Sequence, residues 1–553
     1  MPTVRFNKDV FERYAGKKLP LDELKERISF LGTDLEGIED NIITVEVFPN
    51  RPDMLSVQGF ARAFSSFIGK NTGLLEYEVH PSKEKVIIEK SVHDVRPYTA
   101  CAIVRGLHFD DEKIKEVIDI QEKLHITYGR NRKKIAIGIY PFEKIKMPIT
   151  FTARKPEDIV FRPLGAEKEM DAKEILELHP TGKQYGHLLL GKKHYPVFLD
   201  ATGKVLSLPP IINSHETGRI TEKTQEVFIE CSGFDYGLLS TCLNMILAAL
   251  SDMGGKIESL ELEYSGKTLV SPDLSPKELD VEIHYLNKRL GLTLSEKEFS
   301  QLLSRMGFGY KHKKVLVPAY RADILHQIDI AEDIAIAHGY EHFEEIIPKV
   351  ATVARESPRE IFKNKVADLL VGLGYQEAST YNLSNEEHQS SLMNTRVSPI
   401  RLTNAVSLEY NVLRSWLLPA LFELSRHNTH YEYPQKIFTM GMAFSKDSHE
   451  ETGVREDLKL AILSSHDKAD YTEGRQIVEY ILRSIDVFGK KIEEADHPSF
   501  IPGRCARILI GSKEIGIIGE VSPRVLRNWG LSMPAVALEI HLDTLFTLLG
   551  NSY

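Results

Sequence analysis

Residues 321–340 read RADILHQIDIAEDIAIAHGY, and they combine acidic side chains with the hydrophobic spacing of a helix. Three apolar residues of this stretch recur four and three positions apart, Ile330, Ile334 and Ala337. This periodicity is typical of a helix that packs one face on a core. The residues before Ile328 lack it, so the stretch predicts an extended or looped segment that leads into a helix.

The same stretch contains four carboxylates, Asp323, Asp329, Glu332 and Asp333. The last three stand at helical positions that share one face, and Asp323 lies close enough in sequence to fold back onto them. Clusters of carboxylate oxygens suit the hard cations Mg2+ and Ca2+, and Mg2+ keeps several waters and takes ligands from a partner. Alternatively, the acids complement the dipole at the start of the helix and face solvent. Spacing alone favours this second interpretation.

The length and composition predict a protein of several domains. A chain of 553 residues corresponds to roughly three to five domains of about 100 to 200 residues each, and its 42% of hydrophobic residues is enough for several buried cores. The formal net charge of -10 argues against a uniformly basic nucleic-acid-binding protein. A nucleic acid would therefore have to meet a local basic patch.

Export and a membrane span are not predicted. The first residues, MPTVRFNKDVFERYAG, lack the apolar core of a signal peptide, and no apolar run approaches the length of a membrane span. The four cysteines form no CxxC pair, so their spacing suggests neither a disulfide framework nor a zinc ribbon. We therefore expect a cytoplasmic protein with no membrane partner.

Changes in periodicity and proline-rich linkers divide the chain into four predicted domains, so the expected fold class is multidomain α+β. We expect an N-terminal small domain over residues 1–75 and a mixed α/β domain over 86–265. After the linker SPDLSP follows a small winged-helix-like domain over 272–346, whose acidic helix argues against direct contact with DNA phosphates. Residues 358–553 alternate strands and helices in a pattern that predicts an antiparallel sheet with helices.

A basic loop, GRNRKK, lies in the second of these predicted domains. Its four positive charges are Arg130, Arg132, Lys133 and Lys134. Such a cluster could contact phosphates, and a solvated loop is an equally good interpretation. The sequence leaves both interpretations open.

Residues 205–235, VLSLPPIINSHETGRITEKTQEVFIECSGFD, contain two adjacent prolines and many hydroxyl and amide groups. Alternating residues near the end of this segment predict a strand. We expect a cleft between the PPIIN turn and this strand, lined by Ser207, Asn213, Glu230 and Ser232. These groups could recognise a small polar ligand. A serine-hydrolase interpretation of Ser214 and His215 is weak, because a catalytic triad is set by geometry and not by adjacency in sequence.

Several motifs follow one another along nearly the whole chain: NRPDMLSVQG, GRNRKKIAIG, PPIINS with VFIECSGFD, VPAYRADILHQIDIAEDIAIAHGY, EYNVLRSWLLPALF, and PGRCARILIG with IIGEVSP. In this order they resemble the beta subunit of phenylalanyl-tRNA synthetase of the archaeal and eukaryotic type. Several motifs in a fixed order are more specific than any one of them. The resemblance implies assembly with an alpha subunit into an alpha2-beta2 heterotetramer that acts on the tRNA for phenylalanine.

The resemblance also implies roles for the acidic stretch and for the C-terminal domain. In the family, the four acids that match Asp323, Asp329, Glu332 and Asp333 are assigned to a Mg2+ shared with the alpha subunit, which makes the metal interpretation the better one. The C-terminal domain resembles a class II synthetase catalytic domain that has lost its chemistry. A catalytic copy would carry an F-R-x-E motif whose arginine holds the ATP phosphates, and residues 444–447 read FSKD instead. ATP is therefore expected to be a substrate of the assembled enzyme, through the alpha subunit.

The region around PPIIN resembles the editing domain of the family, which hydrolyses tyrosine wrongly esterified to the tRNA for phenylalanine. A hydrophobic synthetic pocket cannot strongly reject an isostere that adds a hydroxyl, whereas a site that hydrogen-bonds this hydroxyl discriminates by roughly 10^4 to 10^5. We expect Glu230 or Ser232 to read the tyrosine hydroxyl, Ser207 and Asn213 to shape the pocket, and a bound water to attack. The chain departs from the acid-x-Thr pattern of the family, because it has Glu-Cys-Ser at 230–232.

Two other functions are alternatives. One is a free-standing aminoacyl-tRNA deacylase, which would be active without a partner. The other is a non-catalytic nucleic-acid-binding protein built on residues 272–346, which would bind duplexes in a salt-dependent manner. The ordered motifs at both ends of the chain count against both alternatives.

Overall fold

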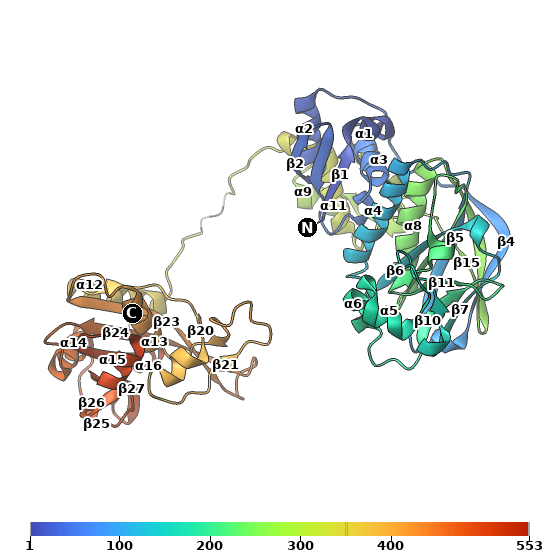
Figure 1. Ribbon diagram of the computed structural model, residues 1–553. Helices are drawn as coiled ribbons and strands as arrows, with labels where there is room; N and C mark the ends of the chain where they lie inside the picture. The colour runs from blue at the N-terminus through green and yellow to red at the C-terminus, as the bar shows by residue number, and fades with distance from the viewer. Residues whose placement is uncertain (1, 349, 351, 551–553) are drawn as a thin grey trace. The chain divides into compact units, whose positions relative to one another are not determined.

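The computed structural model describes residues 2–348, 350 and 352–550 of the chain. They divide into two compact units, Met1–Ile347 and Pro348–Tyr553 (Figure 1). Each unit has its own β-sheets and its own hydrophobic core, which confirms a multidomain α+β architecture. No helix within the described ranges is long and apolar enough to cross a membrane.

The first unit begins with a small antiparallel sheet covered by helices. Its strands, in the order β1-β3-β2, are Thr3–Asn7, Ile42–Glu46 and Asp34–Glu39. Its helices are α1 (Lys8–Ala15), α2 (Leu21–Phe30) and α3 (Val57–Phe67). Helix α1 packs on α3 through apolar residues at helical spacing. The ring of Phe11 contacts the rings of Phe60 and Phe64.

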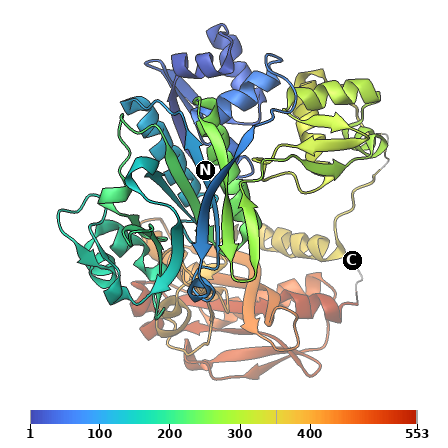
Figure 2. The ribbon, with the colours of Figure 1, turned by 90° about the vertical axis from the view of Figure 1, so that its right-hand side faces the viewer.

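A ten-stranded mixed sheet forms the centre of the first unit, in the order β12-β11-β10-β7-β4-β14-β5-β13-β6 with β15 beside β14. The strands are β4 (Val79–Ile88), β5 (Tyr98–Arg105), β6 (Ile135–Pro141), β7 (Ile149–Arg154), β10 (Tyr195–Leu199), β11 (Val205–Leu208), β12 (Ile212–Asn213), β13 (Val227–Gly233), β14 (Lys256–Tyr264) and β15 (Lys267–Ser271). Strands β4 and β14 are far apart in the sequence but run side by side and parallel (Figure 2).

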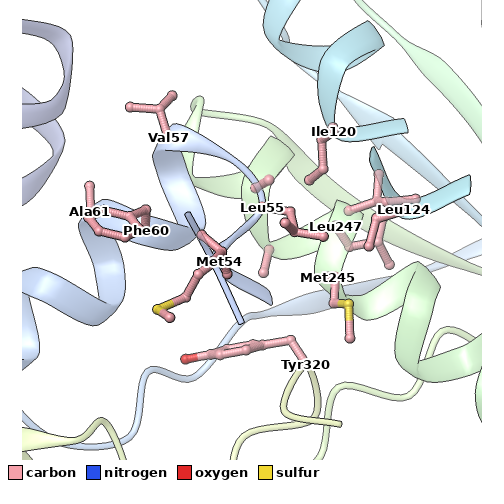
Figure 3. Close-up of a cluster of buried hydrophobic side chains, with 14 of the residues drawn as sticks. Met54, Leu55, Val57, Phe60, Ala61, Ile120, Leu124, Met245, Leu247 and Tyr320 are labelled. Carbon is pink, nitrogen blue, oxygen red and sulfur yellow. The ribbon is translucent and has the colours of Figure 1, made fainter. Parts of the chain in front are cut away.

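Two long helices, α4 (Asp111–Ile126) and α8 (Tyr236–Asp252), lie beside this sheet (Figure 1). Side chains from both helices meet residues of the N-terminal region around Leu55 in one buried cluster (Figure 3). On β13 the alternate residues Val227, Ile229 and Cys231 belong to this cluster. Because successive strand residues face opposite sides of a sheet, Glu230 faces away from the helices.

Short elements surround the β10–β11 end of the large sheet. They are β8 (Val160–Phe161), β9 (Met170–Asp171), α5 (Ala172–Leu178), α6 (Pro180–Tyr185) and the single turn α7 (His215–Gly218). Helices α5 and α6 contact each other and lie next to β10 in Figure 1. Their apolar residues form a separate small core with those of β10 and β11.

The acidic stretch lies in the last part of the first unit. This part has a sheet in the order β16-β18-β17, with strands Lys277–Asp280, Lys314–Val317 and Gly309–Lys311. Its helices are α9 (Ile283–Leu290), α10 (Glu296–Arg305) and α11 (Gln327–His338). Helix α11 is the helix that the hydrophobic spacing predicts. Its buried residues belong to the same core as those of the N-terminal region, so these parts pack as one unit.

The second unit is built on a seven-stranded sheet in the order β19-β23-β24-β28-β27-β26-β25. Its strands are β19 (Gln376–Glu377), β23 (Gln435–Lys446), β24 (Val454–Ser465), β25 (Lys490–Glu494), β26 (Phe500–Ile510), β27 (Lys513–Val521) and β28 (Ala535–His541). All neighbours are antiparallel except β19 and β23, as the sequence pattern predicts. A small sheet, β20-β22-β21 (Leu383–Ser384, Val412–Leu413, Ile400–Arg401), accompanies it. The α-helices are α12 (Pro358–Gly372), α13 (Leu418–His427), α14 (Tyr471–Ser484), α15 (Pro523–Trp529) and α16 (Leu542–Leu548).

Candidate functional site

A cavity of about 230 Å3 lies between β13, the turn after β11 and the helices α4 and α6. Three of the four predicted cleft residues line it, Ser207, Asn213 and Glu230. A more open groove of about 530 Å3 runs along Leu74–Tyr77 and Pro272–Pro276, but none of its lining residues has a buried polar atom without a partner. The smaller cavity has three such residues, and for this reason it is the better candidate for a polar ligand.

Glu230 is the buried acid of this cavity. Its Oε1 accepts a hydrogen bond from the hydroxyl of Tyr140 at 3.2 Å. Strands β6 and β13 pair so that Gly138 stands opposite Glu230. A Cβ atom on Gly138 would lie 2.0 Å from the Tyr140 hydroxyl oxygen and 2.7 Å from Glu230 Oε1. Glycine is therefore required to leave room for the Tyr140–Glu230 pair.

Burial raises the pKa of Glu230 to about 8, although the positive charge of Arg96 and the hydrogen bond from Tyr140 favour the ionised form. Below this pH the carboxyl group is mostly protonated, so it can both donate and accept a hydrogen bond. Its Oε2 atom is buried and has no hydrogen-bond partner among the residues that the structure describes. A neutral carboxyl with one free oxygen suits a hydroxyl group of a ligand.

Two further polar groups of the cavity come from adjacent short strands. Ser207 on β11 pairs with Asn213 on β12. Asn213 Oδ1 lies 3.5 Å from the hydroxyl oxygen of Tyr140. The Oγ atom of Ser207 and the Nε atom of Arg132 are buried without a hydrogen-bond partner in the described part of the chain. Because native interiors leave few buried polar atoms unpaired, their grouping beside Glu230 marks a site for a polar ligand.

The structure separates Ser232 from the other three predicted residues. Ser232 is fully buried but does not line the cavity. Arg96 Nε donates to Ser232 Oγ at 3.2 Å, and Arg96 Nη2 donates to the Ser232 carbonyl at 2.6 Å. Strand alternation puts Glu230 and Ser232 on one face, as expected, but both oxygens of Ser232 accept hydrogen bonds from Arg96.

The basic loop is neither wholly solvated nor wholly available to phosphates. Arg130, Lys133 and Lys134 are exposed, whereas the side chain of Arg132 turns toward the cavity. Arg132 Nη1 donates to the carbonyl of Ile211 at 2.8 Å, and Nη2 donates to Glu122 Oε1 at 2.8 Å. Arg132 therefore ties the loop to the PPIIN turn.

The backbone of this loop is strained. Arg130, Asn131 and Arg132 have φ angles of 49°, 52° and 62°. Residues with a Cβ atom are disfavoured in this left-handed region, and they remain there only when the surrounding structure fixes them. The strained loop places the guanidinium group of Arg132 at the cavity. Strained backbone of this kind is common at functional sites.

Sequence reasoning missed Gly138 and Tyr140. The signal was present in residues 135–140, IAIGIY, because strand alternation puts these two residues on one face. A glycine inside a strand marks a place where another group approaches closely. This combination could have pointed to a buried contact partner for the acid on the neighbouring strand.

The acidic stretch is organised by an arginine. Arg321 Nε and Nη2 donate to the two carboxylate oxygens of Asp323 at 2.8 and 2.7 Å, and Nη2 also donates to Asp333 Oδ2 at 2.7 Å. Burial opposes the ionisation of both acids. For Asp333 this effect prevails and its pKa is raised. For Asp323 the attraction of Arg321 outweighs burial, so its pKa is lowered. The buried pair Arg51–Asp53, joined by two hydrogen bonds of 2.9 Å, acts electrostatically on the same cluster.

The four predicted metal ligands do not converge. Asp329 Oδ2 accepts hydrogen bonds from the backbone N–H groups of Leu325 and His326, both at 2.8 Å, and so caps α11. Glu332 is exposed while Asp333 is buried, because one helical step turns the side-chain direction by about 100°. No group of three His, Cys, Asp or Glu residues in the described ranges could hold a metal ion. A cation site made by all four acids of this chain alone does not fit this arrangement.

The place expected for an ATP-binding arginine is the end of β23. Phe444 is buried there, and Ser445 and Lys446 are exposed. Arg524 and Arg527 lie exposed on α15. The end of β23 therefore has no arginine at the position where a catalytic copy would carry one.

Three family descriptions match the chain. The "Phenylalanyl tRNA synthetase beta chain CLM domain" matches residues 343–542, the "tRNA synthetase B5 domain" matches 279–340, and the "B3/4 domain" matches 107–240. The B3/4 match contains the predicted cleft residues, and the B5 match contains the acidic stretch.

Proteins similar to the chain over its whole length are named phenylalanine-tRNA ligase beta subunit. The one from Pyrococcus abyssi is 40% identical and covers 99% of this chain and 100% of its own length. The one from Thermococcus kodakarensis is 38% identical and covers 99% of both chains. A crystal structure of an N-terminal fragment of the phenylalanyl-tRNA synthetase beta subunit from Pyrococcus horikoshii has a TM-score of 0.59 at 38% identity, and covers 61% of this chain and 99% of that chain.

Proposed function

Because the chain belongs to the family of phenylalanyl-tRNA synthetase beta subunits, we propose that the cavity around Glu230 hydrolyses tyrosine wrongly esterified to the tRNA for phenylalanine. The observation that carries this proposal is the buried carboxyl of Glu230, a residue that lines a cavity of about 230 Å3 and whose Oε2 has no hydrogen-bond partner among the described residues. Drug-sized ligands occupy about 300 to 1,000 Å3, so this cavity suits a smaller group such as one amino-acid side chain.

In the proposed reaction, the neutral Glu230 carboxyl donates a hydrogen bond to the phenolic oxygen of tyrosine. Ser207 and Asn213 hold the aromatic ring and the ester near it. A water molecule adds to the ester carbonyl carbon, the bond from this carbon to the ribose oxygen breaks, and the ribose oxygen takes up a proton from the water. The chain contributes orientation and charge complementarity to this step, and no serine or cysteine of the cavity attacks.

Discrimination follows from the unpaired groups. A phenylalanine side chain in this cavity would leave Glu230 Oε2 without a partner, whereas a tyrosine hydroxyl pairs with it. Leaving a buried polar group unpaired costs about 1 to 3 kcal/mol, and sites built on such pairing reject the analogue without the hydroxyl by roughly 10^4 to 10^5. The same cavity therefore spares correctly charged tRNA.

The test is hydrolysis of tyrosyl-tRNA and phenylalanyl-tRNA, both made on the tRNA for phenylalanine, by the full chain assembled with its alpha subunit. We expect tyrosine to be released at least about 100-fold faster than phenylalanine. Equal rates, or no hydrolysis of either ester above the buffer rate, would refute the editing proposal. Activity of the chain without the alpha subunit would favour a free-standing deacylase.

For the acidic helix we propose that two of the four acids, and not all four, bind a metal ion. Asp323 and Asp333 balance Arg321, while Glu332 and the free oxygen of Asp329 remain available for a Mg2+ that the alpha subunit completes in an alpha2-beta2 heterotetramer. The family uses ATP and Mg2+ in aminoacylation, and the ATP-dependent step belongs to the alpha subunit. The exposed Leu325 and Ile328 beside these acids fit a contact with that partner.

This role predicts that Mg2+ strengthens the complex of the two subunits. The change to make is the double substitution Asp329→Asn and Glu332→Gln. We expect EDTA to weaken the wild-type complex roughly tenfold, since few ligands anchor the ion, and to leave the affinity of the variant unchanged. Analytical ultracentrifugation at several concentrations measures both affinities. An equal response of the two complexes to EDTA would show that these acids hold no ion.

A further inference from the structure

A second polar cluster lies next to the cavity and has no role in the reaction described above. Its basic side chains are Lys144, Arg162, His215 and Arg219, which come from three separate segments. Lys144 Nζ donates to the carbonyl of Arg219 at 2.8 Å, and the backbone N–H of His215 donates to the carbonyl of Arg162 at 2.8 Å. Hydrogen bonds to backbone carbonyls therefore fix these residues to one another, and the charges of Lys144, Arg162 and Arg219 all act on His215.

Two nitrogen atoms of this cluster lack partners. Arg162 Nε and His215 Nδ1 are shielded from solvent and have no hydrogen-bond partner within the residues described. Burial and the nearby positive charges of Arg162, Arg219 and Lys144 lower the pKa of His215, and the charge of Glu216 opposes them. Buried donors under net positive charge lack the anion that would satisfy them.

The cluster stands at a defined distance from the cavity. Residues 162–164 run antiparallel to residues 213–215, with a bridge between Pro163 and Ser214 and a hydrogen bond of 2.9 Å from the Leu164 N–H to the Asn213 carbonyl. Leu164 and Asn213 line the cavity. Two of the basic residues, Arg162 and His215, are two positions farther along the same pair of segments, or about 7 Å in extended chain, and the charge of Arg219 acts on His215.

We propose that this basic cluster binds the 5′-phosphate of the terminal nucleotide whose ribose carries the misplaced amino acid. This inference rests on the proposed editing function. A single nucleotide carries both the ester and a phosphate on one ribose, so a ligand whose side chain fills the cavity brings its phosphate to a neighbouring position. Arg162 and Arg219 supply charge-assisted hydrogen bonds to the phosphate oxygens, and His215 Nδ1 supplies a further one when protonated.

The test compares two small substrates, 3′-O-tyrosyladenosine and 3′-O-tyrosyladenosine 5′-monophosphate, with the assembled enzyme. The wild type should hydrolyse the phosphorylated ester at least about tenfold more efficiently, as kcat/KM, because hydrogen bonds to charged groups contribute about 1.5 to 3 kcal/mol. The double substitution Arg162→Gln and Arg219→Gln should abolish this preference and leave kcat/KM for tyrosyladenosine unchanged. The matched control removes two exposed charges of the basic loop, Arg130→Gln and Lys133→Gln, and should keep the preference.

A second measurement is independent of hydrolysis. Titration of the assembled enzyme with adenosine 5′-monophosphate, adenosine and inorganic phosphate, followed by NMR, should show the nucleotide binding at least about tenfold more tightly than adenosine, with an advantage that shrinks at high salt. Equal binding of nucleotide and adenosine would overturn the inference, as would equal losses of the double variant on both esters. If the wild type hydrolyses no tyrosyl ester, the editing proposal fails. The relative binding of adenosine 5′-monophosphate and adenosine then still tests whether the basic cluster binds a phosphate.

Discussion

Replacement of Glu230 with alanine is expected to lower the hydrolysis of tyrosyl-tRNA roughly 10- to 100-fold. The substitution removes both hydrogen-bonding oxygens of the buried carboxyl and leaves the Tyr140 hydroxyl with the longer contact of 3.5 Å to Asn213 Oδ1. Each unpaired buried group costs about 1 to 3 kcal/mol, and 1.36 kcal/mol corresponds to a tenfold change. The measurement is kcat/KM for deacylation by the complex with the alpha subunit. Phenylalanine activation by the same complex should not change, because the proposal assigns this step to the alpha subunit.

The matched variant is Glu230→Gln, which keeps a donor and an acceptor but cannot ionise. With the pKa of Glu230 near 8, the wild-type carboxyl loses its donor as the pH rises through 8. The ratio of the tyrosine and phenylalanine rates should therefore fall above pH 8 in the wild type and stay flat in the glutamine variant. A wild-type ratio that is constant from pH 6 to 9, or full activity of the alanine variant, would show that Glu230 does not read the hydroxyl.

Strand periodicity explains why part of this site could be predicted from the sequence. The alternation of β13 is visible in VFIECSG and puts Glu230 on the face opposite the helices. The PPIIN turn was visible from its prolines, and it brings Ser207 and Asn213 to the same cavity. The sequence suggests that Tyr140 shares a strand face with Gly138, but its contact with Glu230 depends on the strand order, and the contacts of Arg132 depend on a left-handed loop.

Ser232 and the acidic stretch show the limit of such patterns. Spacing specifies which side chains share a face, but it does not specify which neighbour satisfies their hydrogen bonds or charges. Arg96 is 136 residues from Ser232 in the sequence and donates a hydrogen bond to its hydroxyl oxygen. Arg321 stands only two residues before Asp323, so it is visible in the same stretch of sequence. Spacing nevertheless does not identify it as the partner of the acids, because carboxylates at these positions suit a metal ion and a guanidinium group equally well.

Removal of the Arg321 guanidinium is expected to destabilise the first unit by about 3 to 5 kcal/mol. The Arg321 side chain is 2% exposed, and its partners Asp323 and Asp333 are 10% and 6% exposed, so solvent cannot replace the lost charge. Breaking a buried ion pair by removing one partner has a cost of this size. The control is Arg27→Ala, which breaks the half-exposed pair with Glu341 and should cost about 0 to 1 kcal/mol.

The chain offers a way to measure this effect on one unit alone. Both tryptophans, Trp416 and Trp529, belong to the second unit. In urea, tryptophan fluorescence should therefore report an unchanged transition for Arg321→Ala, while hydrogen exchange of the α11 amides should report the loss of stability. A shift of both transitions would mean that the two units unfold together. In that case the free energies of unfolding of Arg321→Ala and Arg27→Ala would be compared for the whole chain.

Magnesium separates the two explanations of the acidic cluster. If Arg321 balances Asp323 and Asp333, Mg2+ has no site between them in the wild type and should leave the stability of the isolated full chain unchanged. In Arg321→Ala the two carboxylates lose their cation, and millimolar Mg2+ should recover part of the lost stability, because a ligand that binds only the folded state stabilises it by RT ln(1 + [L]/Kd). Stabilisation of the wild type by Mg2+ that disappears in Asp323→Asn would show instead that this carboxylate binds the metal. The substitution Asp333→Asn should then have the same effect.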